Sequence, residues 1–359
     1  MSTELERRLE GMLAEAPDPD AGAGEEALVR AISALRPAAG GRRGLRAAVV
    51  VFAAITVLLA IAAGSLAAAG ALHVSFGAKK QQPVTTQLAL PKGAHGIAAL
   101  VDGRLSVLTR GGFRLQGLAA TAAALSPHAL YVAAGIGDSL VAMKPDGHQV
   151  WSHPAGGRVV AIAWAPDALR IAYVAQRGNR LALHVIWGTG THDFTIDRSV
   201  RAVRPSWRAD SLALAYVGAG GKAIVYDLEH ESRNILRTAA PVTHLAFAPV
   251  GRTLLVATPD SAILAGQKVA AGRVETIGWF SGRPAIALAM PTTTRIRSFG
   301  SAGPSLDDFV VPGTVLAFAD GLVVNETHDK VLAGWGREKA VDTLLEVRPT
   351  TSVEDVAIG

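Results

Sequence analysis

The sequence predicts an all-β protein, a β-propeller preceded by one transmembrane helix and a short helical N-terminal segment. Three observations lead to this fold class. A pattern of paired β runs recurs about every 40 residues in the second part of the chain, which is the signature of a propeller. Residues 47–72 form one uncharged apolar run, and helix-length amphipathic patterns are scarce after residue 80. Seven blades are favoured, with six as the alternative.

Residues 1–46 contain two short amphipathic patterns. Thr3 and Glu6 fit a capping box, and an apolar stripe follows at helical spacing through Leu13. A second stripe runs from Glu25 to Leu35, after a break rich in Asp, Pro and Gly. Two helices of this size bury little surface on their own, so we expect a cytoplasmic segment that docks on a partner or is largely disordered.

Residues 47–72 are expected to form a transmembrane helix in contact with membrane lipid. A helix of this length extends about 39 Å, compared with about 30 Å for the hydrocarbon core of a bilayer. Arg42, Arg43 and Arg46 precede the span, which favours a cytoplasmic N-terminus and an extracytoplasmic C-terminal part. A signal anchor is the simplest interpretation, and cleavage after the small residues 67–69 is the alternative.

Residues 73–96 are expected to be a linker containing one strand at 85–90, and residues 97–348 a propeller. Each repeat has an apolar strand that ends in an aromatic residue or Leu, then a tight turn, then a second strand. The anchor residues are separated by 39, 43, 40, 32 and 39 residues, and they are Leu125, Trp164, Trp207, Phe247, Trp279 and Phe318. The third strand of each repeat is also apolar, and the fourth is more polar, as expected at the rim.

The first blade lacks an inner strand in this scheme. Residues 97–101, 104–108 and 113–117 supply three strands before the first complete repeat. The run 341–347, or the strand at 85–90, is expected to fill the gap and close the ring, because an open ring leaves two unpaired sheet edges. Residues 349–359 are then a C-terminal tail.

The composition excludes several kinds of chemistry. The chain has no Cys, which rules out disulfides, thiolate zinc sites and a Cys nucleophile. It has 35 Lys and Arg against 30 Asp and Glu, and the excess forms no basic stripe with interleaved aromatic residues, so no nucleic-acid partner is expected. The ten His are scattered, and Asp167, Asp210 and Asp320 occupy the repeated turn, where Asp is favoured structurally. We therefore assign no catalytic, cofactor-binding or metal residues and no cofactor.

Residues 164–174, Trp-Ala-Pro-Asp-Ala-Leu-Arg-Ile-Ala-Tyr-Val, resemble the blades of TolB-like and WD-repeat-like propellers. Blades of those families carry a Trp-Ser-Pro-Asp-Gly turn followed by Ile-Ala-Tyr or Ile-Ala-Phe. The sequence departs from that pattern at Arg208 and Ala209, where Ser-Pro is expected, and at Val250, where Asp is expected. The layout of the whole chain is similar to that of membrane-anchored anti-sigma factors of bacteria, without the zinc-binding His and Cys residues that some of them use.

These features lead to three functional expectations. The first is a single-pass membrane protein that is not an enzyme, whose propeller binds a protein or glycan ligand and whose residues 1–46 signal to a cytoplasmic partner such as a sigma factor. The second is an envelope assembly or scaffolding factor, with residues 1–46 as part of an anchor. The third is a propeller enzyme of the lactonase or lyase type. Fold resemblance alone does not choose among them.

Overall fold

A computed structural model describes the propeller part of the chain. The described residues are 90, 94–109, 112–280, 282–300, 303–319, 322–327, 330–335, 341–346 and 353–358. The expected N-terminal segment 1–46, the span 47–72 and nearly all of the linker 73–96 lie outside these residues. Among the described residues, no helix is long and apolar enough to cross a membrane.

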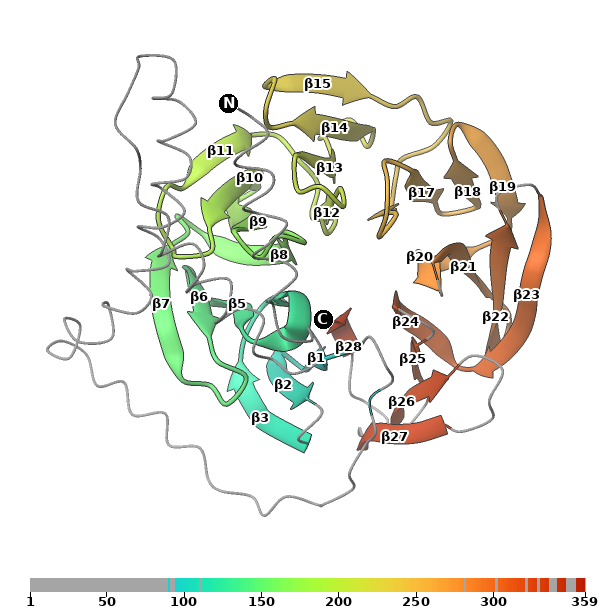
Figure 1. The fold of residues 1–359 in the computed structure, drawn as a ribbon, viewed down its shortest axis with the longest axis horizontal. Coiled ribbons are helices and arrows are strands. Elements are labelled where there is room, and N and C mark those ends of the chain that lie inside the picture. Colours follow the sequence, from blue (N-terminus) through green and yellow to red (C-terminus); the bar gives the residue numbers. More distant parts are fainter. Residues whose placement is uncertain are drawn as a thin grey trace, which may run out of the picture. The chain divides into compact units, whose positions relative to one another are not determined.

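The described strands form seven four-stranded antiparallel sheets arranged in a propeller (Figure 1). In six of them, which we call blades 1 to 6, four consecutive strands follow one another from the centre of the ring to its rim. The seventh, which we call the closing sheet, combines the last of the described strands with the first three of them. Its strands are β28 (Val353–Ile358), β1 (Gly96–Val101), β2 (Arg104–Thr109) and β3 (Gly112–Ala119).

The first three blades follow the repeats expected from the sequence. Blade 1 contains β4 (Ala123–Leu125), β5 (Val132–Ile136), β6 (Ser139–Met143) and β7 (Gln149–Pro154), with the 3-10 turn η2 (Pro127–Ala129) after β4. Blade 2 contains β8 (Arg158–Trp164), β9 (Arg170–Arg177), β10 (Arg180–Trp187) and β11 (Phe194–Asp197). Blade 3 contains β12 (Ser206–Trp207), β13 (Ala213–Val217), β14 (Ala223–Asp227) and β15 (Ser232–Ile235).

The remaining three blades have the same order. Blade 4 contains β16 (His244–Phe247), β17 (Leu254–Thr258), β18 (Ser261–Leu264) and β19 (Gln267–Ala271). Blade 5 contains β20 (Val274–Phe280), β21 (Arg283–Ala289), β22 (Thr293–Gly300) and β23 (Gly303–Pro312). Blade 6 contains β24 (Thr314–Ala319), β25 (Leu322–Glu326), β26 (Lys330–Trp335) and β27 (Val341–Glu346).

The ring is closed by a different segment from the one expected. The run 341–347, or the strand at 85–90, was expected to supply the missing inner strand. β27 is instead the outer strand of blade 6, and residues 85–89 lie outside the described residues. The inner strand of the closing sheet is instead β28, within the segment 349–359 that was expected to be a tail. It pairs with β1 from Ile97 opposite Ile358 to Val101 opposite Val353. Two acidic residues inside 353–358 make this strand look polar in sequence, yet its pairing removes the exposed edge of β1.

The core lies between neighbouring sheets and is rich in alanine. Between blades 1 and 2, buried Ile162, Ile171 and Tyr173 pack against small residues of blade 1 such as Ala124 and Ala133. Small side chains allow the sheets to approach closely, and at Gly135 the approach requires glycine. A Cβ atom there would lie 2.8 Å from the Cβ of Val159. The close fit explains why these strands are apolar on both faces.

Tryptophan side chains connect successive inner strands. The indole N–H of Trp207 in blade 3 donates to the carbonyl oxygen of Ala163 in blade 2, at 3.0 Å. The indole N–H of Trp279 in blade 5 donates to the carbonyl oxygen of Ala246 in blade 4, at 3.1 Å. In both cases the acceptor directly precedes the anchor residue of the neighbouring repeat. The repeated aromatic position therefore contributes a hydrogen bond between blades as well as apolar surface.

Arg204 connects three sheets near the centre of the ring. It lies just before β12, the shortest inner strand, which follows Pro205, a residue without a backbone N–H. Its guanidinium donates to the carbonyl oxygen of Val356 in β28 at 2.9 Å and to that of Ala123 in β4 at 3.1 Å. A side chain from blade 3 therefore binds the backbone of the closing sheet and of blade 1. In Figure 1 the C-terminus accordingly lies inside the ring.

Candidate functional site

The candidate binding surface is the face of the propeller that carries the turns between first and second strands. The turns between third and fourth strands lie on the same face, because each blade is an antiparallel meander. We call this surface the turn face. Its loops carry the side chains that differ from blade to blade, whereas the strands beneath them hold positions fixed by packing.

The first-to-second-strand turns of blades 2 and 3 share one backbone geometry. Ala168 and Ser211 occupy equivalent positions and have φ values of 59° and 58°, in the left-handed region. The preceding Asp side chain supports each turn. Asp167 Oδ1 accepts from the N–H of Leu169, and Asp210 Oδ1 accepts from the N–H of Leu212, both at 2.9 Å. The structural role expected for Asp167 and Asp210 matches these contacts, and Asp320 lies outside the described residues.

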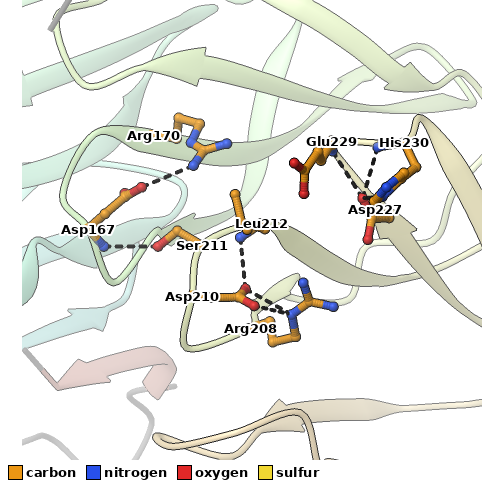
Figure 2. A network of polar contacts seen from close by, with 9 residues as sticks. All are labelled: Asp167, Arg170, Arg208, Asp210, Ser211, Leu212, Asp227, Glu229 and His230. Atoms are coloured by element: carbon orange, nitrogen blue, oxygen red, sulfur yellow. Dashed lines mark hydrogen bonds and ion pairs between the residues drawn. The ribbon is translucent and has the colours of Figure 1, made fainter. Parts of the chain in front are cut away.

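Ion pairs and hydrogen bonds fix the charged side chains around these turns (Figure 2). Arg170 Nη2 lies 3.0 Å from Asp167 Oδ2, and Arg208 Nε lies 2.8 Å from Asp210 Oδ1. The hydrogen bond from Arg208 is the main cause that lowers the pKa of Asp210. The two turns are also joined, because the N–H of Asp167 donates to Ser211 Oγ at 3.0 Å. Blades 2 and 3 thus present one connected surface with its charges held in place.

A third turn extends this network within blade 3. Asp227 Oδ1 accepts from the backbone N–H groups of Glu229 and His230, each at 3.0 Å, and lies 3.0 Å from His230 Nδ1. The backbone hydrogen bond from His230 is the main cause that lowers the pKa of Asp227. Asp227 therefore acts as a turn former, in the same way as Asp167 and Asp210.

Leucine side chains are exposed at one repeated position of the turn face. Leu130, Leu169 and Leu212 each lie five residues after the anchor residue of their blade, and their exposed fractions are 44%, 37% and 38%. Val250, in the corresponding turn of blade 4, is 84% exposed. The repeat therefore places apolar side chains on the surface in four successive blades, where packing of the ring does not require them.

An aromatic hollow lies between blades 2 and 3 and adjoins two of these leucines, because its lining residue Arg170 follows Leu169 and the N–H of its lining residue Leu228 donates to the carbonyl oxygen of Leu212. It has a volume of about 390 Å³. We define the aromatic hollow by its lining, which is Arg170, Trp187, Phe194, Thr195, Tyr226, Leu228 and Glu231. Phe194 lies in the outer strand β11, and its aromatic side chain is 42% exposed. Burial, followed by the charge of Glu231, raises the pKa of Tyr226, so its phenol stays neutral at ordinary pH.

Arg170 is the charged group held most firmly in the hollow. Besides its ion pair with Asp167, its guanidinium carbon lies 5.7 Å from the ring centroid of Trp207. A guanidinium held between a carboxylate and an indole face loses little further freedom when a ligand binds. The hollow therefore offers three aromatic rings and one preorganised cation.

Histidines that are scattered in sequence form two clusters in space. His153 Nε2 of blade 1 and His184 Nδ1 of blade 2 each lie 3.4 Å from Asp193 Oδ2, and the ring of Tyr173 stacks on His184 with centroids 5.0 Å apart. Burial alone would raise the pKa of Asp193, but the hydrogen bond and charge of His184 outweigh it, and the pKa is lowered. This cluster joins the outer parts of blades 1 and 2.

The second cluster is the pair His95 and His128, whose facing nitrogen atoms are 3.4 Å apart. Neither cluster is visible as a sequence motif, because the paired histidines are 31 and 33 residues apart and come from different sheets. Within the described part of the chain, no group of three His, Asp or Glu side chains is placed to hold a metal ion. His73 and His328 lie outside the described residues.

Comparisons with known proteins identify no family. No protein-family model matches the chain, and no curated protein matches it. The fold and the geometry of the turn face are therefore the basis for the ligand site proposed below.

Proposed function

We propose that this protein is a non-enzymatic binding module whose propeller takes a protein ligand at the aromatic hollow. The observation that carries this proposal is the combination of Trp187, Phe194 and Tyr226 with the fixed guanidinium of Arg170, beside exposed Leu169 and Leu212. Aromatic residues and Arg are the residue types enriched where protein ligands bind most strongly. The surrounding ion pairs reduce the conformational entropy lost on binding.

The cellular role that we propose rests on sequence alone. Residues 47–72 anchor the chain in the membrane, residues 1–46 face the cytoplasm and the propeller is extracytoplasmic. Ligand binding on the propeller is communicated through residues 1–46 to a cytoplasmic partner such as a sigma factor. The similarity to TolB-like and WD-repeat-like propellers and the layout shared with membrane-anchored anti-sigma factors support this proposal.

The ligand site is tested by photocrosslinking from a single position in the full-length protein. A photoreactive residue at Phe194 is expected to capture one discrete protein species in native membranes. The matched control carries the same photoreactive residue at Val310, which lies in blade 5 and is 54% exposed. Leu169→Asp and Leu212→Asp, which put charge beside the hollow, are expected to abolish capture at Phe194. Equal capture at Phe194 and Val310, or capture that both Asp substitutions leave intact, would contradict the proposed site.

The signalling role is tested separately at the other end of the chain. Photoreactive groups at Leu9 or Leu28, on the two predicted apolar stripes, are expected to capture a cytoplasmic regulator. Replacing residues 1–46 with an unrelated anchor is expected to abolish function while leaving capture at Phe194 unchanged. Full function of that chimera would instead identify the protein as an envelope scaffold.

A further inference from the structure

A second cleft, separate from the aromatic hollow, lies where the closing sheet meets blade 1. It has a volume of about 560 Å³. We call it the basic cleft and define it by its polar lining, His95, Thr109 and Arg114 from the closing sheet and His128, Tyr131, Lys144 and Asp146 from blade 1. The turn residues Ala129, Leu130 and Pro145 complete its wall. The cleft therefore spans the junction at which the chain closes its ring.

Cations outnumber carboxylates in the lining of the basic cleft. Arg114 and Lys144 are permanent cations at neutral pH, and two imidazoles lie near them, against the single carboxylate of Asp146. Asp146 Oδ1 is already occupied, because it accepts from the backbone N–H of His148 at 2.9 Å. It thus serves its own turn in the same way as Asp167 and Asp210 serve theirs.

Neither cation has a carboxylate partner among the residues that the structure describes. The hydrogen bond that Arg114 makes runs from Nε to Thr109 Oγ1, at 3.4 Å, and places the guanidinium beside the cleft. Among the described residues, neither Arg114 nor Lys144 forms an ion pair. The aromatic hollow differs in this respect, because its cation Arg170 is paired with Asp167. Among the described residues, the two cations of the basic cleft are therefore not paired with a carboxylate, although Asp146 lines the same cleft.

The histidine pair adds donors at the same place. His128 Nδ1 and His95 Nε2 are 3.4 Å apart, with ring centroids separated by 4.9 Å and planes inclined at 76°. The position of His128 depends on an unusual backbone, with φ values of 65° at His128 and 53° at Ala129. The facing nitrogen atoms lie within hydrogen-bonding distance of each other, so one imidazole donates to the other, and an anion that accepts from both rings would replace this contact.

A metal ion fits this lining less well than an anion. A cation placed at the two imidazoles would be repelled by Arg114 and Lys144. The described residues also provide no third His, Asp or Glu ligand arranged with them for a metal. An anion, in contrast, is attracted by both permanent cations and can accept hydrogen bonds from the imidazole N–H groups.

We propose that the basic cleft is a binding site for an anionic ligand bearing a carboxylate or phosphate group. Arg114 and Lys144 supply the charge, His95 and His128 donate to the bound oxygens, and the ring of Tyr131 borders the rest of the ligand. The ligand touches both the closing sheet and blade 1, so its binding stabilises the closed ring by mass action. The site is independent of the protein ligand at the aromatic hollow.

The test is calorimetric titration of the full-length protein with two probes, inorganic phosphate and succinate, at constant ionic strength. Saturable binding of at least one probe is expected, together with a saturable rise in the melting temperature. Phosphate alone would identify a phosphate-bearing ligand, and succinate alone a carboxylate. Perturbation of the His95 and His128 ring signals in nuclear magnetic resonance spectra would locate the binding.

Matched substitutions distinguish the cleft from general electrostatic attraction. Arg114→Gln and Lys144→Gln, both at exposed positions, are expected to weaken binding at least 10-fold each. Lys268→Gln in β19 removes the same charge from an exposed position in blade 4 and is expected to leave the affinity unchanged. His128→Gln is expected to weaken binding and to remove the perturbation of His95.

Three outcomes would overturn the proposal. They are the absence of saturable binding by either probe, equal losses of affinity in Lys144→Gln and Lys268→Gln, and saturable binding of zinc by a protein that binds neither anion. None of these outcomes changes the crosslinking expected at Phe194, so the two proposals succeed or fail separately.

Discussion

Single side chains decide how neighbouring blades are joined. Trp207 is 6% exposed and shares a hydrogen bond with blade 2, whereas Trp187 is half-buried and its indole N–H has no partner among the described residues. The same residue type thus has a structural role in an inner strand and a surface role beside the turn face. The spacing of the repeat identifies Trp207 as an anchor, but only the structure shows its acceptor.

Trp207→Phe is expected to lower the free energy of unfolding by about 2–3 kcal/mol. The substitution removes buried ring volume and leaves the carbonyl of Ala163 without its donor. Urea unfolding followed by circular dichroism measures the change. Trp187→Phe removes the same atoms from a half-buried position and is expected to lower the free energy of unfolding by less than about 1 kcal/mol. Equal losses in the two variants would show that the bond between blades contributes little.

Asp193 is expected to make stability depend on pH in the acid range. Its pKa in the folded protein is lowered, so its charged form stabilises the fold above the unfolded pKa of about 4. That contribution is lost as the pH falls through the lower folded pKa. Asp193→Asn should therefore destabilise the protein at pH 6 and much less at pH 3, measured by thermal unfolding. Asp138→Asn, the same substitution at an exposed position, is the matched control and is expected to show no such dependence. A constant difference between Asp193→Asn and the native protein across this range would contradict the prediction.

At the scale of the element, the repeated turn combines sequence preference with backbone strain. The TolB-like and WD-repeat-like pattern has Gly where this chain has Ala168 and Ser211, and both residues have left-handed φ values. In blade 4 the equivalent residue is Gly251, whose φ is 82°. The chain therefore retains the turn geometry in blades where the residue best suited to it is absent.

Ala168→Gly is expected to raise the free energy of unfolding by about 1 kcal/mol. The gain from relieving a left-handed alanine exceeds the larger entropy of glycine in the unfolded chain. Ala202→Gly is the matched control, because Ala202 is exposed and its φ is not positive. The control is expected to lose about 0.5–1 kcal/mol. A loss of stability in both variants would mean that the turn is not strained at Ala168.

At the scale of the whole molecule, closure depends on the last strand of the chain. β28 pairs with β1, and Arg204 binds both β28 and β4. Arg204→Gln is expected to increase hydrogen exchange at β28 and β4 selectively, because their carbonyls lose a charged donor. Arg201→Gln, an exposed neighbour whose guanidinium bonds the carbonyl of Ala219, should change exchange only locally. Uniform loss of protection in Arg204→Gln would argue against a role in closure.

A disulfide across the junction tests the closed ring directly. Ala98 and Ala357 are partners in the β1–β28 register, and the chain has no other Cys to compete. The oxidised double variant Ala98→Cys/Ala357→Cys is expected to be more stable than its reduced form by about 2–4 kcal/mol. The reduced form of the double variant is the control for its oxidised form, and mass spectrometry confirms that the disulfide has formed. The same unfolding midpoint in both redox states would contradict closure through these strands.

The sequence by itself determined the repeat, the polarity of the four strands in each blade and the need for a distant segment to supply the inner strand of the closing sheet. These features arise from local physics, namely strand periodicity, turn chemistry and the burial of an inner strand on both faces. Only the tertiary structure decided that β28 closes the ring, that Arg204 reaches two distant inner strands, and that the aromatic hollow and the basic cleft form between sheets. Each of these joins residues far apart in the chain. Their positions follow from how seven sheets pack around one axis, which no local pattern encodes.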